Sequence, residues 1–304
     1  MDEGLITLED SEHLSGFIAI TGPPNAGKST LLNRLLGRKV AIVSPKPQTT
    51  RNRILGIRSG DGFQMVFIDT PGVHRTKTPL HKSMVASAEA TFYEVDIVLV
   101  MIEMPRHEGH DISLIMGNLK KTKKRSILVI NKIDKGPREN LLGIIESYRT
   151  RHAFDAIIPI SALTGDGVGE LVELLKTRLR PGPAFYPKDM TTDQPERFLI
   201  SEVIREKIYF HTRKELPYSC AVRIDEMKEN PEKDLLSIYA HIHVETASQK
   251  AILIGHQGKM AKAVGRSSRL DLERLLGVHI FLDLLVKVDK NWSRDPKALK
   301  RLGY

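Results

Sequence analysis

Short apolar runs alternate with amphipathic patterns along the first part of the chain, up to Leu179. Apolar runs of this length are typical of buried strands, and apolar positions spaced by three and four residues are typical of helices. The predicted strands are Phe17–Thr21, Ile54–Arg58, Gln64–Asp69, Ile97–Glu103, Ile127–Asn131 and Ala156–Ser161. The predicted helices are Lys28–Leu36, His81–Tyr93, Ile112–Lys120, Glu139–Arg149 and Val168–Leu179. This alternation predicts an α/β domain with a doubly wound, mostly parallel sheet covered on both faces.

One connection between predicted strands is too short for a helix. Ser59-Gly60-Asp61-Gly62 separates the second strand from the third and has the composition of a tight turn. A turn of this length joins antiparallel neighbours, so we expect a hairpin and one antiparallel edge strand on the parallel sheet.

Proline and glycine interrupt the alternation at Pro181-Gly182-Pro183 and again at Pro187. We place a domain boundary there because such residues end regular elements. The predicted parts are a tail (1–16), a first domain (17–181), a linker (182–194), a second domain (195–290) and a C-terminal tail (291–304). The second domain has a different element order, with helix Pro195–Tyr209, strands Tyr218–Met227 and Leu235–Val244, helices Ser248–Ile254 and Met260–Leu276, and strand His279–Val288.

Composition narrows the class of protein. A chain of 304 residues with 41% hydrophobic content can bury two cores, which argues against global disorder. Its formal net charge of +9 favours a polyanionic partner, either nucleic acid or an anionic membrane surface. Cys220 is the only cysteine, which excludes an internal disulfide and a cysteine metal cluster and is consistent with a reducing cytosol. The apolar run Ile97–Ile102 is too short to cross a bilayer.

The first predicted strand leads into a glycine-rich loop, Gly22-Pro23-Pro24-Asn25-Ala26-Gly27-Lys28-Ser29, followed directly by a helical pattern. Glycines in such a loop let backbone N–H groups converge on an anion, and the helix adds its positive end. We expect Lys28 to reach the β- and γ-phosphates of a nucleotide, and the Ser29 hydroxyl to bind Mg²⁺. The predicted phosphate-binding residues are Gly22, Asn25, Ala26, Gly27, Lys28, Ser29 and Thr30.

Asp69-Thr70-Pro71-Gly72 follows another predicted strand. A carboxylate at this position can hold Mg²⁺ through its water shell, and Gly72 can place a backbone N–H against a γ-phosphate because it has no Cβ. Taken alone, the sequence also fits an ordinary turn at a strand end.

Asn131-Lys132-Ile133-Asp134 ends a third strand and predicts a base site. Guanine presents two donors on one edge that the Asp134 carboxylate can accept, whereas adenine would set a lone pair against it. We expect Asn131 to tie this loop to the phosphate loop and the Lys132 stem to cover the base. Ser161-Ala162-Leu163 ends a fourth strand and can offer a backbone N–H to the guanine carbonyl. Open parallel sheets bind ligands at these strand ends.

In the second domain, the loop Gly255-His256-Gln257-Gly258 joins two predicted helices. A G-x-x-G loop between helices clamps the sugar–phosphate backbone in KH domains, and the element order is similar to the type II KH topology. The tetrapeptide alone is a weak signal. The prediction rests on its placement between two helices, with two strands before them and one strand after. The predicted RNA-binding residues are the four loop residues with Lys259, Lys262, Arg266 and Arg269 on the basic helix.

Together these motifs resemble the translation-factor-like P-loop GTPases, and with the following KH domain they resemble the Era family from about Phe17 to Lys290. The resemblance makes Lys46-Pro47-Gln48-Thr49-Thr50-Arg51 the first switch. Either threonine could complete the Mg²⁺ shell, and we favour Thr50. With Lys28 and Gly72, Thr50 forms the predicted catalytic set; Ser29, Thr50 and Asp69 form the metal set.

The resemblance implies a monomeric cytoplasmic GTPase that uses GTP, GDP and Mg²⁺. It also implies binding of the 3′ end of small-subunit ribosomal RNA, a role in assembling that ribosomal subunit, and peripheral contact with the inner membrane. Val73 follows Gly72 where Ras-type enzymes place a water-orienting glutamine, and an apolar residue at this position agrees with the Era family. An apolar side chain cannot orient water, so we expect slow intrinsic hydrolysis.

Three alternatives remain at this stage. The chain could be a non-enzymatic RNA chaperone whose nucleotide only stabilises the fold. It could instead be a membrane-surface GTPase whose basic helix meets anionic lipid. An ATPase is the third alternative, and it predicts that Asp134→Asn has no effect on nucleotide selectivity.

Overall fold

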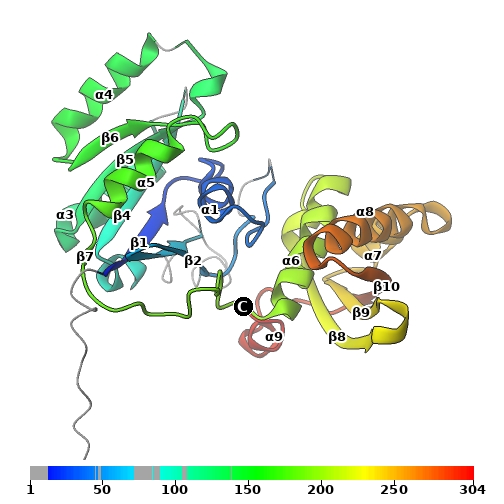
Figure 1. Cartoon of the computed structure of the whole chain (residues 1–304). Helices are drawn as coiled ribbons and strands as arrows, with labels where there is room; N and C mark the ends of the chain where they lie inside the picture. The colour runs from blue at the N-terminus through cyan, green and yellow to red at the C-terminus, as the bar shows by residue number, and fades with distance from the viewer. Residues whose placement is uncertain are drawn as a thin grey trace, which may run out of the picture. The chain divides into compact units, whose positions relative to one another are not determined.

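The computed structural model describes residues 13–304 except 45, 47, 48, 72–83, 85–89, 105–107 and 138. The chain forms two compact units (Figure 1). Unit 1 holds the described residues up to Val40 and from Asn52 to Asp193, and unit 2 holds Ala41–Arg51 and Gln194–Tyr304. The segment Ala41–Arg51 therefore belongs to unit 2, although it lies between two elements of unit 1 along the chain.

The sheet of unit 1 has the strand order β2-β3-β1-β4-β5-β6. β1, β3, β4, β5 and β6 run parallel, and β2 pairs antiparallel with β3, so the predicted sheet and its hairpin are confirmed. The strands are β1 (Leu14–Thr21), β2 (Ile54–Gly60), β3 (Phe63–Asp69), β4 (Ile97–Glu103), β5 (Arg125–Asn131) and β6 (Ala156–Pro159).

Helices cover this sheet, as the apolar spacing predicts. They are α1 (Lys28–Leu36), α3 (His110–Thr122), α4 (Asn140–Arg151) and α5 (Val168–Lys176). One core joins α3 and α4 to β4 and β5 through residues such as Ile115, Tyr148 and Val100. On β2, a Cβ at Gly56 would lie 2.7 Å from the Leu32 side chain of α1, so glycine allows this close packing. The predicted helix His81–Tyr93 lies largely outside the described residues.

The segment predicted as a linker is held by unit 1. A short strand, β7 (Arg180–Pro181), pairs antiparallel with the start of β1. Farther along, the Thr191 carbonyl accepts a hydrogen bond from the Ile57 amide at 2.8 Å, and the Thr192 hydroxyl donates to the Leu55 carbonyl at 2.6 Å. The last helix, α5, ends at Lys176, before the prolines, and the chain then continues through β7 and along β2.

Unit 2 contains a three-stranded sheet in the order β10-β9-β8, with β9 parallel to β10 and antiparallel to β8. The elements are α6 (Glu196–His211), β8 (Cys220–Asn230), β9 (Leu235–Val244), α7 (Ala247–Ile254), α8 (Lys259–Leu276), β10 (His279–Val288) and α9 (Pro296–Arg301). Parallel β9 and β10 require a crossover, which α7 and α8 provide, and this confirms the predicted type II KH order.

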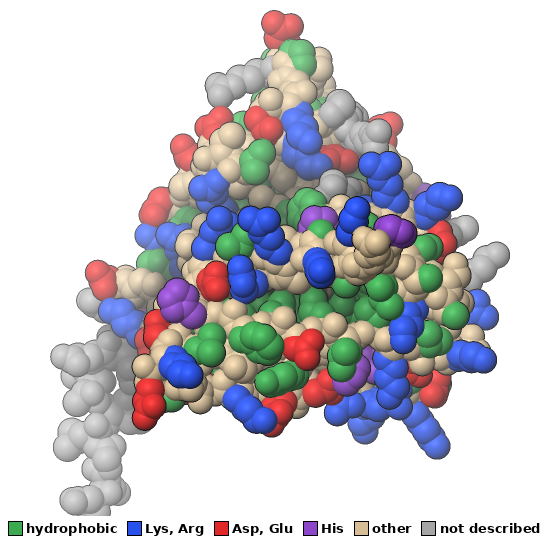
Figure 2. Space-filling view, turned by 90° about the vertical axis from the view of Figure 1, so that its right-hand side faces the viewer, with side chains coloured by type: hydrophobic (Ala, Val, Ile, Leu, Met, Phe, Trp, Pro, Cys, Tyr) green, Lys and Arg blue, Asp and Glu red, His purple; other side chains and the backbone are tan. Residues whose placement is uncertain are grey.

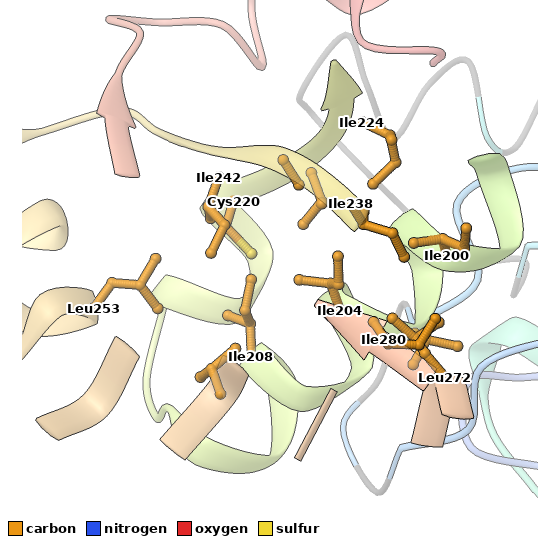
Figure 3. Packing of buried hydrophobic residues seen from close by; sticks show 14 of the residues in the cluster. Ile200, Ile204, Ile208, Cys220, Ile224, Ile238, Ile242, Leu253, Leu272 and Ile280 are labelled. Carbon is orange, nitrogen blue, oxygen red and sulfur yellow. The ribbon is translucent and has the colours of Figure 1, made fainter. Parts of the chain in front are cut away.

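The core of unit 2 lies between its helices and one face of the sheet. Figure 3 shows Ile204 and Ile208 of α6 near Ile238 and Ile242 of β9, with Leu272 of α8 closing the cluster. All five side chains are buried. No helix among the described residues has the length and apolar content needed to span a membrane.

The predicted C-terminal tail folds as part of unit 2. Trp292 is fully buried, and its Nε1–H donates to the Ser219 carbonyl at 3.1 Å. Leu299 and Leu302, in and after α9, are buried as well. The prediction was wrong here because so short an element leaves little periodic signal.

Ile204→Ala should lower the free energy of unfolding of unit 2 by about 2–5 kcal/mol, because it removes buried methyl and methylene groups and leaves a cavity. Trp292 is the only tryptophan, so its emission during denaturant titration reports on unit 2. Ile252→Ala, at a side chain 51% exposed, is the matched control and should cost far less. Equal unfolding midpoints for the two variants would contradict this account of the core.

Candidate functional site

The loop after β1 has the backbone that an anion cradle needs. Asn25 and Gly27 both adopt positive φ, at 64° and 97°, and α1 begins at the next residue, Lys28. A Cβ at Gly27 would lie 2.2 Å from the Asn131 amide nitrogen, and one at Gly22 would lie 2.4 Å from the Met101 carbonyl. Both glycines are therefore required by close packing.

Lys28 is placed to receive a phosphate. Its side chain is buried, and its Nζ donates to the carbonyls of Gly22 at 3.1 Å and Pro23 at 3.0 Å. Burial lowers the pKa of Lys28, and the nearby Asp69 carboxylate offsets part of that effect. A bound phosphate would supply further negative charge and so favour the protonated form.

A hydroxyl and a carboxylate meet beside this lysine. The Ser29 hydroxyl donates to Asp69 Oδ2 at 2.6 Å, and Asp69 is fully buried at the end of β3. Hard oxygen donors of this kind suit Mg²⁺, which keeps several waters and takes few protein ligands. The residues present therefore fit the predicted magnesium site. Thr30 follows in the first turn of α1 and is half-buried.

Asn131 joins three loops through its side chain. Its Nδ2 donates to the Ala26 carbonyl at 2.7 Å, and its Oδ1 accepts from the Ala162 amide at 2.9 Å. The side chain is almost completely buried. This geometry agrees with the predicted tie between the base loop and the phosphate loop and extends it to the loop after β6.

The remaining residues of the base site lie around this bridge. Asp134 is exposed, and its Oδ1 accepts a hydrogen bond from the Ser161 hydroxyl at 2.6 Å, which orients the carboxylate. Lys132 adopts positive φ, at 65°, and its Nζ donates to the Asn25 carbonyl at 2.7 Å. It also pairs with Glu103, and the two contacts together fix the position of the side chain.

Sequence reasoning missed Arg34 and Glu103. Arg34 lies in the last turn of α1, where its guanidinium donates to the carbonyls of Ala162, at 3.2 Å from Nε, and Leu163. It thereby adds two hydrogen bonds to the Ser161-Ala162-Leu163 loop, which Asn131 also holds. No motif marks either residue, because each acts through a partner distant in sequence.

The predicted switch segment is part of unit 2. Thr49, Thr50 and Arg51 are all buried there. The Arg51 guanidinium donates to the carbonyls of Cys220 at 2.8 Å, Tyr218 at 2.8 Å and Pro217 at 3.3 Å. Thr50 stays a predicted magnesium ligand, and Gly72, Val73 and His74 lie outside the described residues.

Aromatic side chains complete the surroundings of Arg51. Its guanidinium carbon lies 5.3 Å from the ring centre of Tyr304 and 5.8 Å from that of Trp292, and one nitrogen donates to the Tyr304 hydroxyl at 3.2 Å. A buried guanidinium with carbonyl acceptors and aromatic rings around it is held strongly. The segment 217–220 and the C-terminal residues together form this Arg51 pocket.

A second buried arginine holds the same segment. Arg205 of α6 forms a two-pronged ion pair with Glu202 and donates to the Thr49 carbonyl at 2.5 Å. Burial alone would lower the pKa of Arg205, but the Glu202 carboxylate raises it above its usual value, so the guanidinium stays charged. The Val43 amide donates to Glu206 at 2.9 Å. Unit 2 therefore holds this segment at both its start and its end.

Three of the four residues in the G-x-x-G loop of unit 2 have positive φ. Gly255, Gln257 and Gly258 adopt positive φ, at 71°, 50° and 75°. A Cβ at Gly255 would lie 2.8 Å from the Met260 side chain, whereas one at Gly258 would meet nothing within 4 Å. Gly258 thus leaves open space at the start of α8, where a phosphate could approach the helix N-terminus.

Four cations follow this loop along one face of α8, at the spacing of successive helical turns. Lys259, Lys262, Arg266 and Arg269 are all exposed, and Arg269 lies 3.9 Å from Glu273. Figure 2 looks onto the side of α7, α8 and β10 and shows lysine and arginine side chains around a band of hydrophobic ones. Charge beside an apolar surface is the combination that single-stranded RNA requires.

These sites define a P-loop nucleotide-binding protein with a second, KH-type unit. A family model described as 50S ribosome-binding GTPase matches residues 17–132, and a KH domain model matches residues 215–293. GTPase Era of Syntrophus aciditrophicus is 49% identical over 290 residues, covering 95% of each chain. GTPase Era of Geobacter metallireducens is 48% identical over 297 residues, covering 98% of this chain and all of that protein.

Solved structures of Era proteins are similar to this chain as well. A variant of Aquifex aeolicus Era bound to GDP.AlF4- has a TM-score of 0.92 at 41% identity, over 96% of this chain and 99% of that one. Era in complex with MgGDPNP and nucleotides 1506–1542 of 16S ribosomal RNA has a TM-score of 0.90 at 41% identity, over 96% of this chain and 99% of that one. The chain belongs to the Era family of GTPases, and it hydrolyses GTP to GDP and phosphate with Mg²⁺ as its metal.

Asn131→Ala should weaken guanine nucleotide binding by about tenfold or more, because it removes both hydrogen bonds of the bridge and leaves the buried Ala26 carbonyl without a partner. Titration with a fluorescent GDP analogue measures the affinity. Lys135→Ala, at an exposed neighbour of the same loop, should bind as tightly as the unmodified protein. Equal affinity in the Asn131 variant would show that the bridge does not shape the site.

Proposed function

We propose that this protein is a GTP-driven switch that binds the 3′ end of small-subunit ribosomal RNA and assists assembly of that subunit. The observation that carries the proposal is a purine site aligned with a phosphate cradle in one unit and a G-x-x-G clamp in the other. The Era relative crystallised with MgGDPNP and 16S ribosomal RNA combines the same two elements.

Guanine selectivity follows from the Asp134 carboxylate. An oriented, exposed carboxylate can accept both donors on the guanine edge, and Ser161 fixes it without removing its charge. Adenine offers no such pair of donors, so an ATP complex would leave the carboxylate facing a lone pair. Turnover is expected to be slow without a partner, because Val73 cannot orient the attacking water.

The proposed RNA contact uses the loop Gly255–Gly258 with the cationic face of α8. A G-x-x-G loop clamps about four nucleotides, with bases held in an adjacent apolar groove. The RNA in the relative's complex is much longer than that. Other parts of such an RNA are therefore available to further surfaces of the protein.

Coupling between nucleotide and RNA is proposed to run through the segment Ala41–Arg51. In the GTP state Thr50 would complete the Mg²⁺ shell, whereas here the segment is held in unit 2 by Arg51 and Arg205. Two arrangements of one segment would then compete, and GTP would favour the one that leaves the Arg51 pocket.

The proposal also covers where the protein resides and its oligomeric state. The basic charge is compatible with peripheral contact at an anionic inner-membrane surface, and a cytoplasmic, monomeric state is expected from the family resemblance. GTP hydrolysis excludes an RNA chaperone with a merely structural nucleotide. Lys28→Ala should abolish phosphate release, because Lys28 is the residue proposed to reach the β- and γ-phosphates.

Asp134→Asn should abolish tight GTP binding and create binding of xanthosine triphosphate, because the amide reverses one hydrogen-bonding position on the base edge. Isothermal calorimetry with GTP, xanthosine triphosphate and ATP measures the change. Asp155→Asn makes the same chemical change at an exposed residue just before β6, whereas the base site follows the other end of that strand, and this variant should retain GTP selectivity. Equal uptake of ATP and GTP by the unmodified protein would refute the assignment.

Arg51→Lys should raise the affinity for a non-hydrolysable GTP analogue, relative to GDP, by about tenfold. Lysine keeps the charge but cannot reach three carbonyls at once, and charged hydrogen bonds contribute about 1.5–3 kcal/mol each. Arg53→Lys, at a surface ion pair two residues away, is the matched control and should leave the ratio unchanged. An unaltered ratio in a variant that remains folded by circular dichroism would rule out this coupling.

A further inference from the structure

The end of α3 and the start of β5 carry an unusual density of positive charge. Five of the six residues from Lys120 to Arg125 are lysine or arginine, and Lys120, Lys121, Lys123 and Arg125 are exposed. Lys124 is half-buried, and its Nζ donates to the Val95 carbonyl at 2.8 Å. We call the four exposed cations the α3–β5 basic patch.

Within the part of the chain that the structure describes, none of the four forms an ion pair. Other surface cations of unit 1 do, as Arg53 does with Glu94 and Lys176 with Glu173. Burial lowers the pKa of the His152 imidazole, and the positive charge of Lys120 lowers it further. The Asp155 carboxylate opposes this effect. The four cations of the patch therefore remain available to pair with the phosphate groups of a ligand.

The backbone adopts an uncommon conformation within the patch. Lys123 caps the C-terminus of α3 in the left-handed region, with φ 52° and ψ 28°. Glycine is the usual residue at such a position, because a Cβ is disfavoured there. A helix C-terminus favours cations within its last turn, but this effect does not account for a run that continues past the cap into β5.

The patch lies far from the nucleotide site. β5 begins at Arg125, whereas the base loop follows its other end at Asn131. Six residue steps along a parallel strand span about 20 Å. A ligand on the basic patch would consequently leave the phosphate and base loops free.

We infer that the α3–β5 basic patch binds the phosphate backbone of a double-stranded RNA segment. This contact is separate from the G-x-x-G clamp, and it extends the proposed RNA binding to unit 1. Exposed cations at a helix end and at the start of the following strand can neutralise phosphates without reading bases, which suits a duplex. An RNA long enough to pass beyond the KH clamp would supply such a segment.

An anionic membrane fits the patch less well. Stable attachment to lipid usually combines charge with an inserted apolar group. Among the described residues, the large exposed hydrophobic side chains include none between His110 and Arg125. The patch thus offers charge alone, as phosphate-backbone binding requires.

The test compares full-length K120Q/K121Q/K123Q protein with the unmodified protein in binding a blunt-ended RNA duplex over a series of salt concentrations. We expect the triple variant to bind the duplex at least about tenfold more weakly, and the slope of log affinity against log salt to fall by about 0.9 for each phosphate that is no longer neutralised. Lys124 is left in place because it bonds to the backbone. GTP hydrolysis should be unchanged, which confirms that unit 1 is folded.

Two controls sharpen the comparison. K120R/K121R/K123R keeps the charge and should bind the duplex like the unmodified protein. R38Q/K176Q/K188Q removes the same charge from other parts of unit 1 and should have little effect.

Each outcome decides the inference. Undiminished duplex binding by the Gln variant would overturn it, as would an equal loss in the R38Q/K176Q/K188Q control. The variants are also tested for binding to phosphatidylglycerol vesicles. If the Gln variant lost binding to the vesicles but not to the duplex, the patch would be assigned to lipid and the inference would be overturned. Binding of single-stranded RNA should be the same in all variants, because it uses unit 2. If no protein bound single strands while the duplex result held, the proposed function would fail and this inference would stand.

Discussion

The nucleotide site depends on one buried amide. Asn131 bonds to the phosphate loop on one side and to the loop after β6 on the other, and its nitrogen fills the space that a Cβ at Gly27 would need. A flexible glycine-rich loop has a large conformational entropy when unfolded, so its shape must be imposed by its neighbours. Arg34 adds a bond to the loop after β6, and Lys132 adds one to the phosphate loop. The phosphate and base loops thus become one preorganised surface.

The second constraint lies in unit 2, where Arg51 and Arg205 hold the segment Ala41–Arg51. This segment lies between α1 and β2 along the chain. Burying two guanidinium groups is unfavourable unless their donors are satisfied, and here backbone carbonyls, Glu202 and aromatic rings surround them. Such an arrangement tends to be all-or-none, because a partial withdrawal leaves buried groups without partners. All-or-none withdrawal suits a segment that is proposed to occupy one of two discrete positions.

The sequence predicted most of the fold. Parallel strands, the β2–β3 hairpin, the βααβ order of unit 2 and the strand ends that carry the nucleotide motifs lie where the apolar pattern and the turn residues indicated them. The failures share a cause. The segment 182–193 and the region around Trp292 have no regular periodicity, and each is ordered by single hydrogen bonds and apolar contacts to distant residues.

Local patterning by itself therefore determined the elements, their order and the chemistry of the loops, because periodicity and positive-φ positions are encoded in neighbouring residues. Only the tertiary structure decided which backbone carbonyl each long side chain reaches. Every residue offers the same carbonyl, so the partners of Arg34 and Arg51 carry no signature in the chain. Chain folding alone selects them, by bringing one particular carbonyl to the end of each side chain.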